Sequence, residues 1–428
     1  MRYPKVLIIS NNCFSQSGSN GRTLANFFIG WPKKNIAQFY IQNEIPDNEV
    51  CEKYYRITDK QALKGVIKRN NIGEEIKLNI NKDNSEEKVS ALQSNKRYKN
   101  ALTSILRNTI WSITNWNNKE FNQWIDEFNP QIILLQAGDS PFMLKIAEKI
   151  SIIKSIPIII YNSEDYYFKK INYFDDKRFN FLYPLFIKSL RNEYVKIMSK
   201  VKYCIYNTPE LEQVYLKEFE HKSGVIMTST TLDMKKERNN NQCENIAYLG
   251  NLGVGRHQPL IEIAKVLQEI DKNLYLKVYG PIKDTAVKND IDSCEGIKYQ
   301  GEISYSKVIE VMKESDILIH AENSNKFYEE DLKHAFSTKI ADSLASKTCF
   351  LLYAPKSLAC TKYLKENQIA HVASTLEELK NMLDIIISSA EIRNKYIEKA
   401  LKKVEENHNV DKNVEKMRQI IDESIGGI

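Results

Sequence analysis

The stretch that decides the fold is His334-Ala335-Phe336-Ser337-Thr338-Lys339-Ile340-Ala341-Asp342. It continues through Ser343-Leu344-Ala345-Ser346-Lys347 into the apolar run Cys349-Phe350-Leu351-Leu352-Tyr353. The pattern predicts a loop, a helix and then a buried strand. If Ser337 or Thr338 caps the helix, its first backbone N–H groups and the positive end of its dipole face the loop, which can bind an anion. A capped surface helix packed on a sheet explains the same pattern without a ligand.

Two charged side chains follow the cap. Lys339 lies in the first turn, where a positive charge slightly disfavours a helix and makes more sense beside a phosphate. Asp342 lies one turn further on and can accept hydrogen bonds from a sugar diol. We therefore treat the helix start as a candidate site for a phosphorylated sugar compound.

Length and composition limit the class of protein. A chain of 428 residues is too long for one ordinary core, so we expect two domains of about 200 residues each. The formal charge of +6 is compatible with anionic substrates or a membrane surface. No motif for binding nucleic acid accompanies it.

The seven cysteines are scattered and show no Cys-x-x-Cys spacing, which favours a reducing compartment without structural zinc. The amino terminus runs directly into Val6–Ile9, too soon for a signal peptide, and no apolar run of about 18 residues occurs. We therefore expect a cytoplasmic protein.

The first domain opens with a strand and a glycine-rich loop. Val6–Ser10 is an aliphatic run typical of a parallel strand covered on both faces. The loop leads into a helix, and Gly18, Gly21 and Arg22 lie at this junction, where a bare backbone lets a phosphate or sugar approach. Many α/β proteins open in this way without a ligand.

Residues 60–100 lose apolar periodicity, so we expect a polar, partly flexible insertion there. Regularity then returns with a set of aromatic and aliphatic residues at helical spacing: Trp111, Trp116, Phe121, Trp124, Ile125 and Phe128. Stacking on a sugar is one use for tryptophan, but the spacing favours packing in the core.

Two acidic residues follow predicted strands of the first domain. Asp139 comes after the strand 132–135, and Asp165 comes after the strand 156–161. In open α/β sheets the carboxyl ends of strands hold ligands, so either acid can bind an acceptor hydroxyl or serve as a base. Acids at the ends of strands also commonly cap the following helix.

The segment 168–200 interleaves aromatic and basic residues. Such a segment can lie on an anionic bilayer or hold a lipid-linked acceptor. A helix with one apolar face and one solvated basic face gives the same composition.

We place the domain boundary at the polar stretch 235–241. A strand at 246–249 then leads into a second glycine-rich loop with Gly250, Gly253 and Arg256, followed by a helix at 259–270. Strands at 275–279 and 297–300 end at Gly280 and Gly301. The loop does not match the Gly-x-Gly-x-x-Gly spacing of dinucleotide-binding folds. 

The letters Asp290-Ile291-Asp292 match the metal-binding motif of GT-A glycosyltransferases. They lie in a polar stretch that is not the end of an apolar strand, so we expect a solvated loop. The six histidines show no paired metal-ligand motif.

Taken together, the 334–353 stretch and the 250–256 loop resemble the donor domain of GT-B glycosyltransferases, in particular the retaining group called family 4 or group 1. In that family the second acid of a Glu-x7-Glu pair binds the nucleotide ribose, and this acid corresponds to Asp342. His334 replaces the first acid. Ile261 replaces a companion lysine, and Lys347 replaces a glycine.

The resemblance implies an α/β protein of GT-B architecture, with two Rossmann-like, doubly wound domains facing a central cleft. Residues 1–235 would bind the acceptor, with Gly18, Gly21 and Arg22 at the cleft. Residues 236–405 would bind the donor, and a helix at 406–428 would pack back toward the first domain.

The resemblance also implies roles for single residues. Arg256 and Lys339 would stabilise the leaving diphosphate, and Asp139 or Asp165 would be the candidate base. The residues implied in donor binding are Gly250, Gly253, Gly280, Gly301, Ile303, His334, Phe336, Ser337, Thr338 and Asp342.

The function implied is a metal-independent, retaining transfer of a sugar from a UDP- or GDP-linked donor, without a cofactor. The acceptor would be a glycan or lipid-linked acceptor of surface polysaccharide synthesis, with peripheral contact at the inner face of the membrane. Two alternatives stay open: a sugar-nucleotide epimerase, and a non-catalytic GT-B partner subunit of another glycosyltransferase, which the replacements at 334 and 261 would favour.

Overall fold

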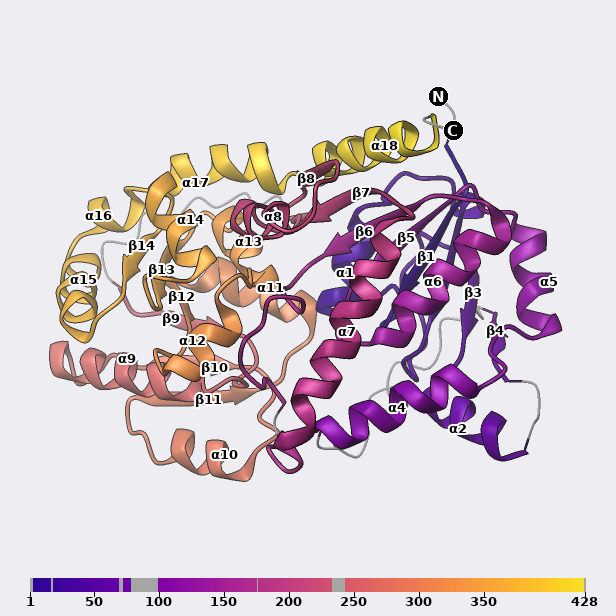
Figure 1. The fold of residues 1–428 in the computed structure, drawn as a ribbon. Helices are drawn as coiled ribbons and strands as arrows, with labels where there is room; N and C mark the ends of the chain where they lie inside the picture. The colour runs from indigo at the N-terminus through magenta and orange to yellow at the C-terminus, as the bar shows by residue number, and fades with distance from the viewer. Residues whose placement is uncertain are drawn as a thin grey trace. The chain divides into compact units, whose positions relative to one another are not determined.

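The computed structural model describes residues 3–16, 18–68, 72–77, 99–174, 176–232 and 243–426. The chain divides into two compact units. The first combines Met1–Tyr206, Tyr215–Val225 and Val414–Ile428, and the second combines Asn207–Val214 and Ile226–Asn413. Each unit contains its own β-sheet, with helices on both faces (Figure 1).

The sheet of the first unit has the order β4-β3-β2-β1-β5-β6-β7-β8. All neighbouring strands are parallel except β3 and β4. The central strands are fully buried runs of aliphatic residues, as expected for a parallel sheet covered on both faces. The strands are β1 Val6–Ser10, β2 Ile36–Tyr40, β3 Lys53–Arg56, β4 Glu74–Ile76, β5 Ile132–Gln136, β6 Ile158–Asn162, β7 Val201–Tyr206 and β8 Ser223–Val225.

Two of the helices that cover this sheet, α4 and α5, begin at side-chain caps. Asn100 and Thr103 form a reciprocal capping box at the start of α4, and the Asn118 side chain accepts the Phe121 N–H at the start of α5. Helices α6 and α7 pack against each other (Figure 1). The helices are α1 Ser19–Asn26, α2 Asp59–Lys68, α4 Ala101–Ile113, α5 Lys119–Phe128, α6 Pro141–Lys154, α7 Tyr183–Met198 and α18 Val410–Gly426, whereas α8 Pro209–Leu216 lies mainly in the second unit.

The aromatic residues predicted to be core are buried in the first unit. Trp111 stacks on Phe142 with ring centroids 4.5 Å apart, and Phe121 contacts both Trp116 and Trp124. The interpretation as core is therefore confirmed. Part of the predicted insertion at 60–100 is regular structure, because α2 and β4 lie there, while residues 69–71 and 78–98 are outside the described residues.

The sheet of the second unit has the order β11-β10-β9-β12-β13-β14, and all of its strands are parallel. The strand order reverses between β9 and β12, and ligands of open α/β sheets bind outside the carboxyl ends at such a reversal. The strands are β9 Ile246–Leu249, β10 Leu276–Tyr279, β11 Ile297–Gly301, β12 Ile317–Ala321, β13 Cys349–Tyr353 and β14 His371–Ala373.

Helices α9 and α15 contact each other, and so do α13 and α17. Strands and helices enclose one apolar core that includes Tyr248, Leu260, Val278, Ile319 and Leu351. The helices of this unit are α9 His257–Ile270, α10 Thr285–Asp292, α11 Tyr305–Glu314, α12 Lys326–Leu332, α13 Thr338–Ala345, α14 Ala359–Asn367, α15 Leu376–Ser388, α16 Ala390–Asn394 and α17 Ile397–Lys403.

A local prediction was wrong. Asp290 and Asp292 lie in the last turn of α10 and not in a loop, because Ile291 between them is buried in the core and gives the segment an apolar side.

The predicted linker 235–241 is outside the described residues. The structure groups residues 207–214 with the second unit and residues 414–428 with the first, so the chain passes between the units more than once. No helix among the described residues is both long and apolar enough to cross a membrane.

Candidate functional site

Three glycines form a bare edge at the carboxyl ends of β9, β10 and β11. The Gly250 N–H donates to the Tyr279 carbonyl at 2.9 Å, and the Gly280 N–H donates to the Gly301 carbonyl at 2.8 Å. A Cβ atom on Gly280 would lie 1.9 Å from the Gly250 carbonyl oxygen, and Gly280 has a φ of +141°. The three predicted glycines are therefore brought together, and only glycine fits at the centre.

Helix α13 begins beside this edge. Ser337 is its N-cap, and the Ser337 Oγ accepts the Lys339 N–H at 3.4 Å. The Lys339 Cε lies 3.4 Å from the position that a Cβ of Gly250 would occupy. The helix start, the lysine and the first glycine thus meet, which places a positive charge and backbone N–H groups at one point.

Arg256 lies at the start of α9 and is held by acceptors of the protein itself. Its Nε donates to Glu322 Oε2 and its Nη2 to Glu322 Oε1, both at 2.8 Å, and its Nη1 donates to Asn251 Oδ1 at 2.9 Å. The His320 Nε2 lies 3.0 Å from Glu322 Oε1. The side chains of Arg256 and Glu322 are only 13% and 6% exposed.

The ionisation of this cluster follows from its contacts. Burial opposes the charge of Glu322, but the Arg256 guanidinium and the His320 ring outweigh it and hold the pKa of the carboxyl at about 2. Burial lowers the pKa of His320. The cluster is thus a carboxylate, a guanidinium and a neutral imidazole, with no net charge.

Hydrogen bonds hold the glycine loop between β9 and α9 at its start and at its end. Asn251 Oδ1 accepts the Gly253 N–H at 3.2 Å, and the Tyr248 hydroxyl donates to the Asn251 carbonyl at 2.7 Å. The Asn323 Nδ2 donates to the Gly255 carbonyl at 2.8 Å. Asn251, His320, Glu322 and Asn323 were missed in the sequence. The last three lie at the carboxyl end of β12, where ligand-binding residues gather in such sheets.

Two residues predicted to bind the donor have side chains that pack inward. Asp342 is only 3% exposed, and its Oδ1 accepts the Thr230 hydroxyl at 2.7 Å. The Phe336 ring packs against Tyr363 and His408. His334 and Thr338 are half-buried near the start of α13, and Ile303 is half-buried ahead of α11.

The first unit brings its predicted residues to one edge of its own sheet. Gly18 is the N-cap position of α1, and Arg22 is half-buried in that helix. A Cβ on Gly21 would lie 2.3 Å from the Cys13 carbonyl oxygen, so α1 packs directly on the loop after β1. A Cβ on Gly138 would lie 2.9 Å from Asn11 Nδ2, which places the ends of β1 and β5 together.

The two acids of this edge differ in their contacts. Asp139 pairs with Lys99, and although burial opposes its charge, Lys99 and Arg107 lower its pKa. Asp165 accepts the Phe168 N–H at 2.8 Å and the Tyr215 hydroxyl at 3.3 Å. No helix begins within residues 166–174, so Asp165 stabilises a turn and does not cap a helix.

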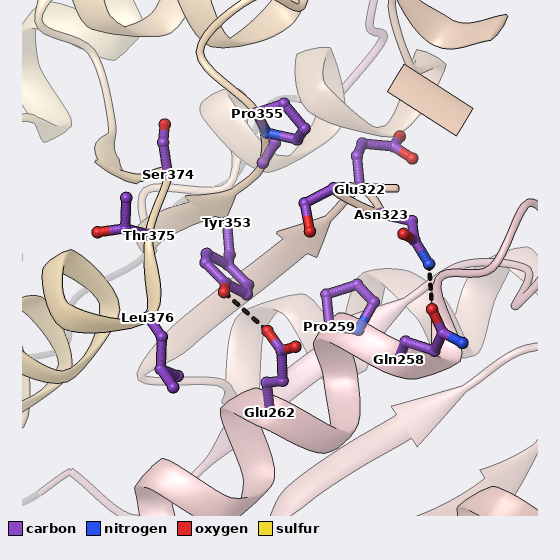
Figure 2. Close-up of a pocket in the computed structure, with 12 residues that line it drawn as sticks. Gln258, Pro259, Glu262, Glu322, Asn323, Tyr353, Pro355, Ser374, Thr375 and Leu376 are labelled. Atoms are coloured by element: carbon purple, nitrogen blue, oxygen red, sulfur yellow. Dashed lines mark hydrogen bonds between the residues drawn. The ribbon is translucent and has the colours of Figure 1, made fainter. Parts of the chain in front are cut away.

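A cavity of about 190 Å³ lies at the carboxyl ends of β12, β13 and β14, beside the start of α9 (Figure 2). The Tyr353 hydroxyl donates to Glu262 Oε2 at 2.7 Å, and Asn323 Nδ2 donates to Gln258 Oε1 at 2.7 Å. Glu322 lines the cavity on the side of Arg256. None of the residues predicted to bind the donor lines it.

Comparison with known proteins identifies the fold. Residues 256–419 match the family model described as glycosyl transferase-like. The whole chain superposes on sucrose-phosphate synthase from Thermosynechococcus elongatus with a TM-score of 0.65, at 9% identity and over 100% of both chains. The chain has the GT-B fold.

Other GT-B structures agree with this. HepE from Anabaena, in complex with UDP and glucose, matches with a TM-score of 0.62 at 10% identity over 100% of both chains. WaaG, a glycosyltransferase involved in lipopolysaccharide biosynthesis, matches with a TM-score of 0.55 at 12% identity over 97% of this chain and 99% of WaaG. No curated protein matches the sequence.

The family match and the fold together support a glycosyltransferase of the GT-B type. Within the part of the chain that the structure describes, no group of three or more His, Cys, Asp or Glu side chains is placed to hold a metal ion.

Proposed function

We propose that this GT-B chain is a retaining glycosyltransferase that takes its sugar from a UDP- or GDP-linked donor bound to the second unit. The observation that carries the proposal is the meeting of Gly250, Lys339 and the capped start of α13. A diphosphate there would accept hydrogen bonds from backbone N–H groups while the dipole and the lysine offset its charge. HepE, a structural neighbour, binds UDP and UDP-glucose at its own site.

The chemistry we propose is electrostatic and needs no metal. Departure of the nucleoside diphosphate from the anomeric carbon leaves negative charge on the phosphate oxygens, where Lys339 and the α13 N–H groups stabilise it. Gly301 leaves room for the nucleotide at the strand edge, because nothing lies within 4 Å of a Cβ built on it, whereas the space beside Gly280 is filled by the Gly250 carbonyl.

We propose that the acceptor is a glycan or lipid-linked acceptor of surface polysaccharide synthesis, and that it binds the first unit at the edge formed by Gly18, Gly21, Arg22 and Asp139. Asp139 keeps its charge through Lys99 and is the better candidate for an acceptor contact. We expect Asp165 to support the fold of this edge through Tyr215.

We propose a cytoplasmic enzyme with peripheral contact at an anionic membrane, made by the segment that leads into α7. Phe181 is 77% and Leu185 60% exposed, and Lys188 lies one turn after Leu185. Flotation with vesicles rich in phosphatidylglycerol tests this. Binding that is lost in a Phe181→Ser, Leu185→Ser variant supports it, and equal binding by that variant contradicts it.

The proposed function is tested by thermal unfolding with UDP-, GDP-, ADP- and CMP-sugars in EDTA. A donor at 100 times its dissociation constant adds about 2.7 kcal/mol to the free energy of unfolding. We expect one nucleotide class to stabilise the protein and Lys339→Gln, which should bind about tenfold more weakly, to keep only about half of the effect at the same donor concentration. Asp342→Ala is less suitable, because it removes a buried hydrogen bond to Thr230.

The non-catalytic partner subunit stays the second candidate, because His334 replaces the family acid and Glu322 neutralises Arg256. It predicts that no nucleotide sugar stabilises the protein. An epimerase would convert the donor sugar without any acceptor, which product analysis detects.

A further inference from the structure

Arg256 and Lys339 are cations near the proposed diphosphate position, and Arg256 is paired with Glu322. We infer that Arg256 and Glu322 form a pin without net charge that positions the glycine loop, and that Lys339 supplies the positive charge to the diphosphate. The second part rests on the proposed function. In this account Glu322 and His320 are positioning residues, whereas Lys339 touches the substrate.

Arg256 and Glu322 form a closely matched pair. The guanidinium meets both oxygens of Glu322 at 2.8 Å as a two-pronged fork, the strongest arrangement of this kind of hydrogen bond. To bind a phosphate through the same N–H groups, Arg256 would have to leave Glu322 behind as a buried, unpaired carboxylate. That is strongly unfavourable, because a buried charge needs a partner.

Glu322 is held in place and cannot move with Arg256. It lies directly after β12, and its N–H donates to the Tyr353 carbonyl at 3.0 Å. Its Oε1 also faces the His320 Nε2 at 3.0 Å. Burial lowers the pKa of His320, so the ring is neutral, and a proton on Nε2 lets it donate to the carboxylate.

The pin connects two neighbouring parts of the sheet edge. Arg256 closes the glycine loop, and its Nη1 donates to Asn251 Oδ1, which also accepts the Gly253 N–H. The fork therefore joins the loop after β9 to the end of β12, two strands that are neighbours in the sheet. The result is a fixed position for Gly250, the residue that Lys339 lies against.

Lys339 lies at the positive end of a helix. It is in the first turn of α13, so its charge and the N-terminal N–H groups of the helix act on the same point. A lysine disfavours this end of a helix, and an anion there would reverse that effect. Arg256 cannot play the same part while Glu322 cancels its charge.

The test compares single and double variants of the full chain. Binding of UDP and of uridine is measured by calorimetry in EDTA, and the melting temperature is measured separately. We expect Lys339→Gln to weaken UDP binding about tenfold, to leave uridine binding unchanged and to leave the melting temperature close to that of the unmodified protein.

For Arg256 and Glu322 we expect the melting temperature to change and the preference for UDP over uridine to stay. Arg256→Gln should lower the melting temperature, because it leaves Glu322 buried and unpaired, and the double variant Arg256→Gln, Glu322→Gln should recover part of the loss. In the double variant the ratio of UDP to uridine affinity should stay within about threefold of that of the unmodified protein. The double variant keeps the test usable if Arg256→Gln alone does not fold.

Two outcomes overturn the inference, and they are distinguishable. If Arg256→Gln weakens UDP but not uridine binding and leaves the melting temperature unchanged, Arg256 is the phosphate ligand and the proposed function survives. If the unmodified protein binds neither UDP and uridine nor GDP and guanosine, measured in the same way, the role of Lys339 and the proposed function fail together. The melting temperatures of the variants would still decide whether the pin exists.

Discussion

At the scale of single residues, the glycines of the donor edge differ in what they require. Gly280 and Gly301 both have positive φ angles, of +141° and +79°. Only Gly280 also faces a backbone atom within contact distance, because nothing lies within 4 Å of a Cβ built on Gly301. The two positions therefore separate backbone strain from steric exclusion.

We expect Gly280→Ala to lower the free energy of unfolding by about 3 kcal/mol or more, because strain and overpacking add. Gly301→Ala is the matched control and should cost about 1 kcal/mol from strain alone. Chemical denaturation of both variants measures the difference. Equal losses would mean that the close approach of Gly280 to Gly250 is absent in solution.

His408 predicts how stability depends on pH. Burial lowers its pKa from 6.5 to about 4, and it contacts the Thr228 carbonyl at 2.7 Å and the Tyr363 hydroxyl at 2.9 Å. Because the pKa is lower in the folded state, its contribution is complete above pH 6.5 and is lost as the pH falls toward 4. At pH 4.5 the loss is about 2.5 kcal/mol relative to pH 7.5.

The measurement is urea unfolding at both pH values, for the unmodified protein and for His408→Gln. The variant should lose less stability on acidification, although it starts less stable. His371, whose pKa burial also lowers to about 4, stays in both proteins and acts as the internal reference. The same loss in both proteins would show that His408 does not titrate as described.

At the scale of elements, helix α13 carries the site, and its start was predictable because serine caps follow from local chemistry. The strands β9 and β13 have the predicted bounds, since each is an apolar run ended by a turn residue or a polar segment. The inward packing of Asp342 was not predictable, because its partner Thr230 is 112 residues away in sequence. The Arg256–Glu322 pair, 66 residues apart, was hidden for the same reason.

A cap variant tests the role of α13. Ser337→Asp keeps a capping oxygen but places a negative charge where the diphosphate is expected, so the melting temperature should hold while UDP binding falls at least tenfold. Ser337→Ala is the companion variant and should cost about 1 kcal/mol of stability. Unchanged UDP binding by Ser337→Asp would show that the diphosphate does not bind at the start of α13.

At the scale of the whole molecule, two sheets with separate cores explain why length and periodicity predicted two α/β domains. The grouping of residues 207–214 with the second unit was beyond prediction, because contacts distant in sequence decide it. Glu322 at the end of β12 is the clearest example of a residue whose contacts could not be predicted from the sequence. The edge of the sheet could be predicted, but not which of its side chains contact each other.

The most direct measurement is a crystal structure of the complete chain with UDP or its preferred nucleotide sugar. The account predicts the diphosphate at the first N–H groups of α13 with Lys339 Nζ within hydrogen-bonding distance, and the Arg256–Glu322 fork intact. A diphosphate bound to Arg256 with the fork broken would contradict the inference about the pin. A nucleotide bound away from Gly250 and α13 would contradict the proposed site itself.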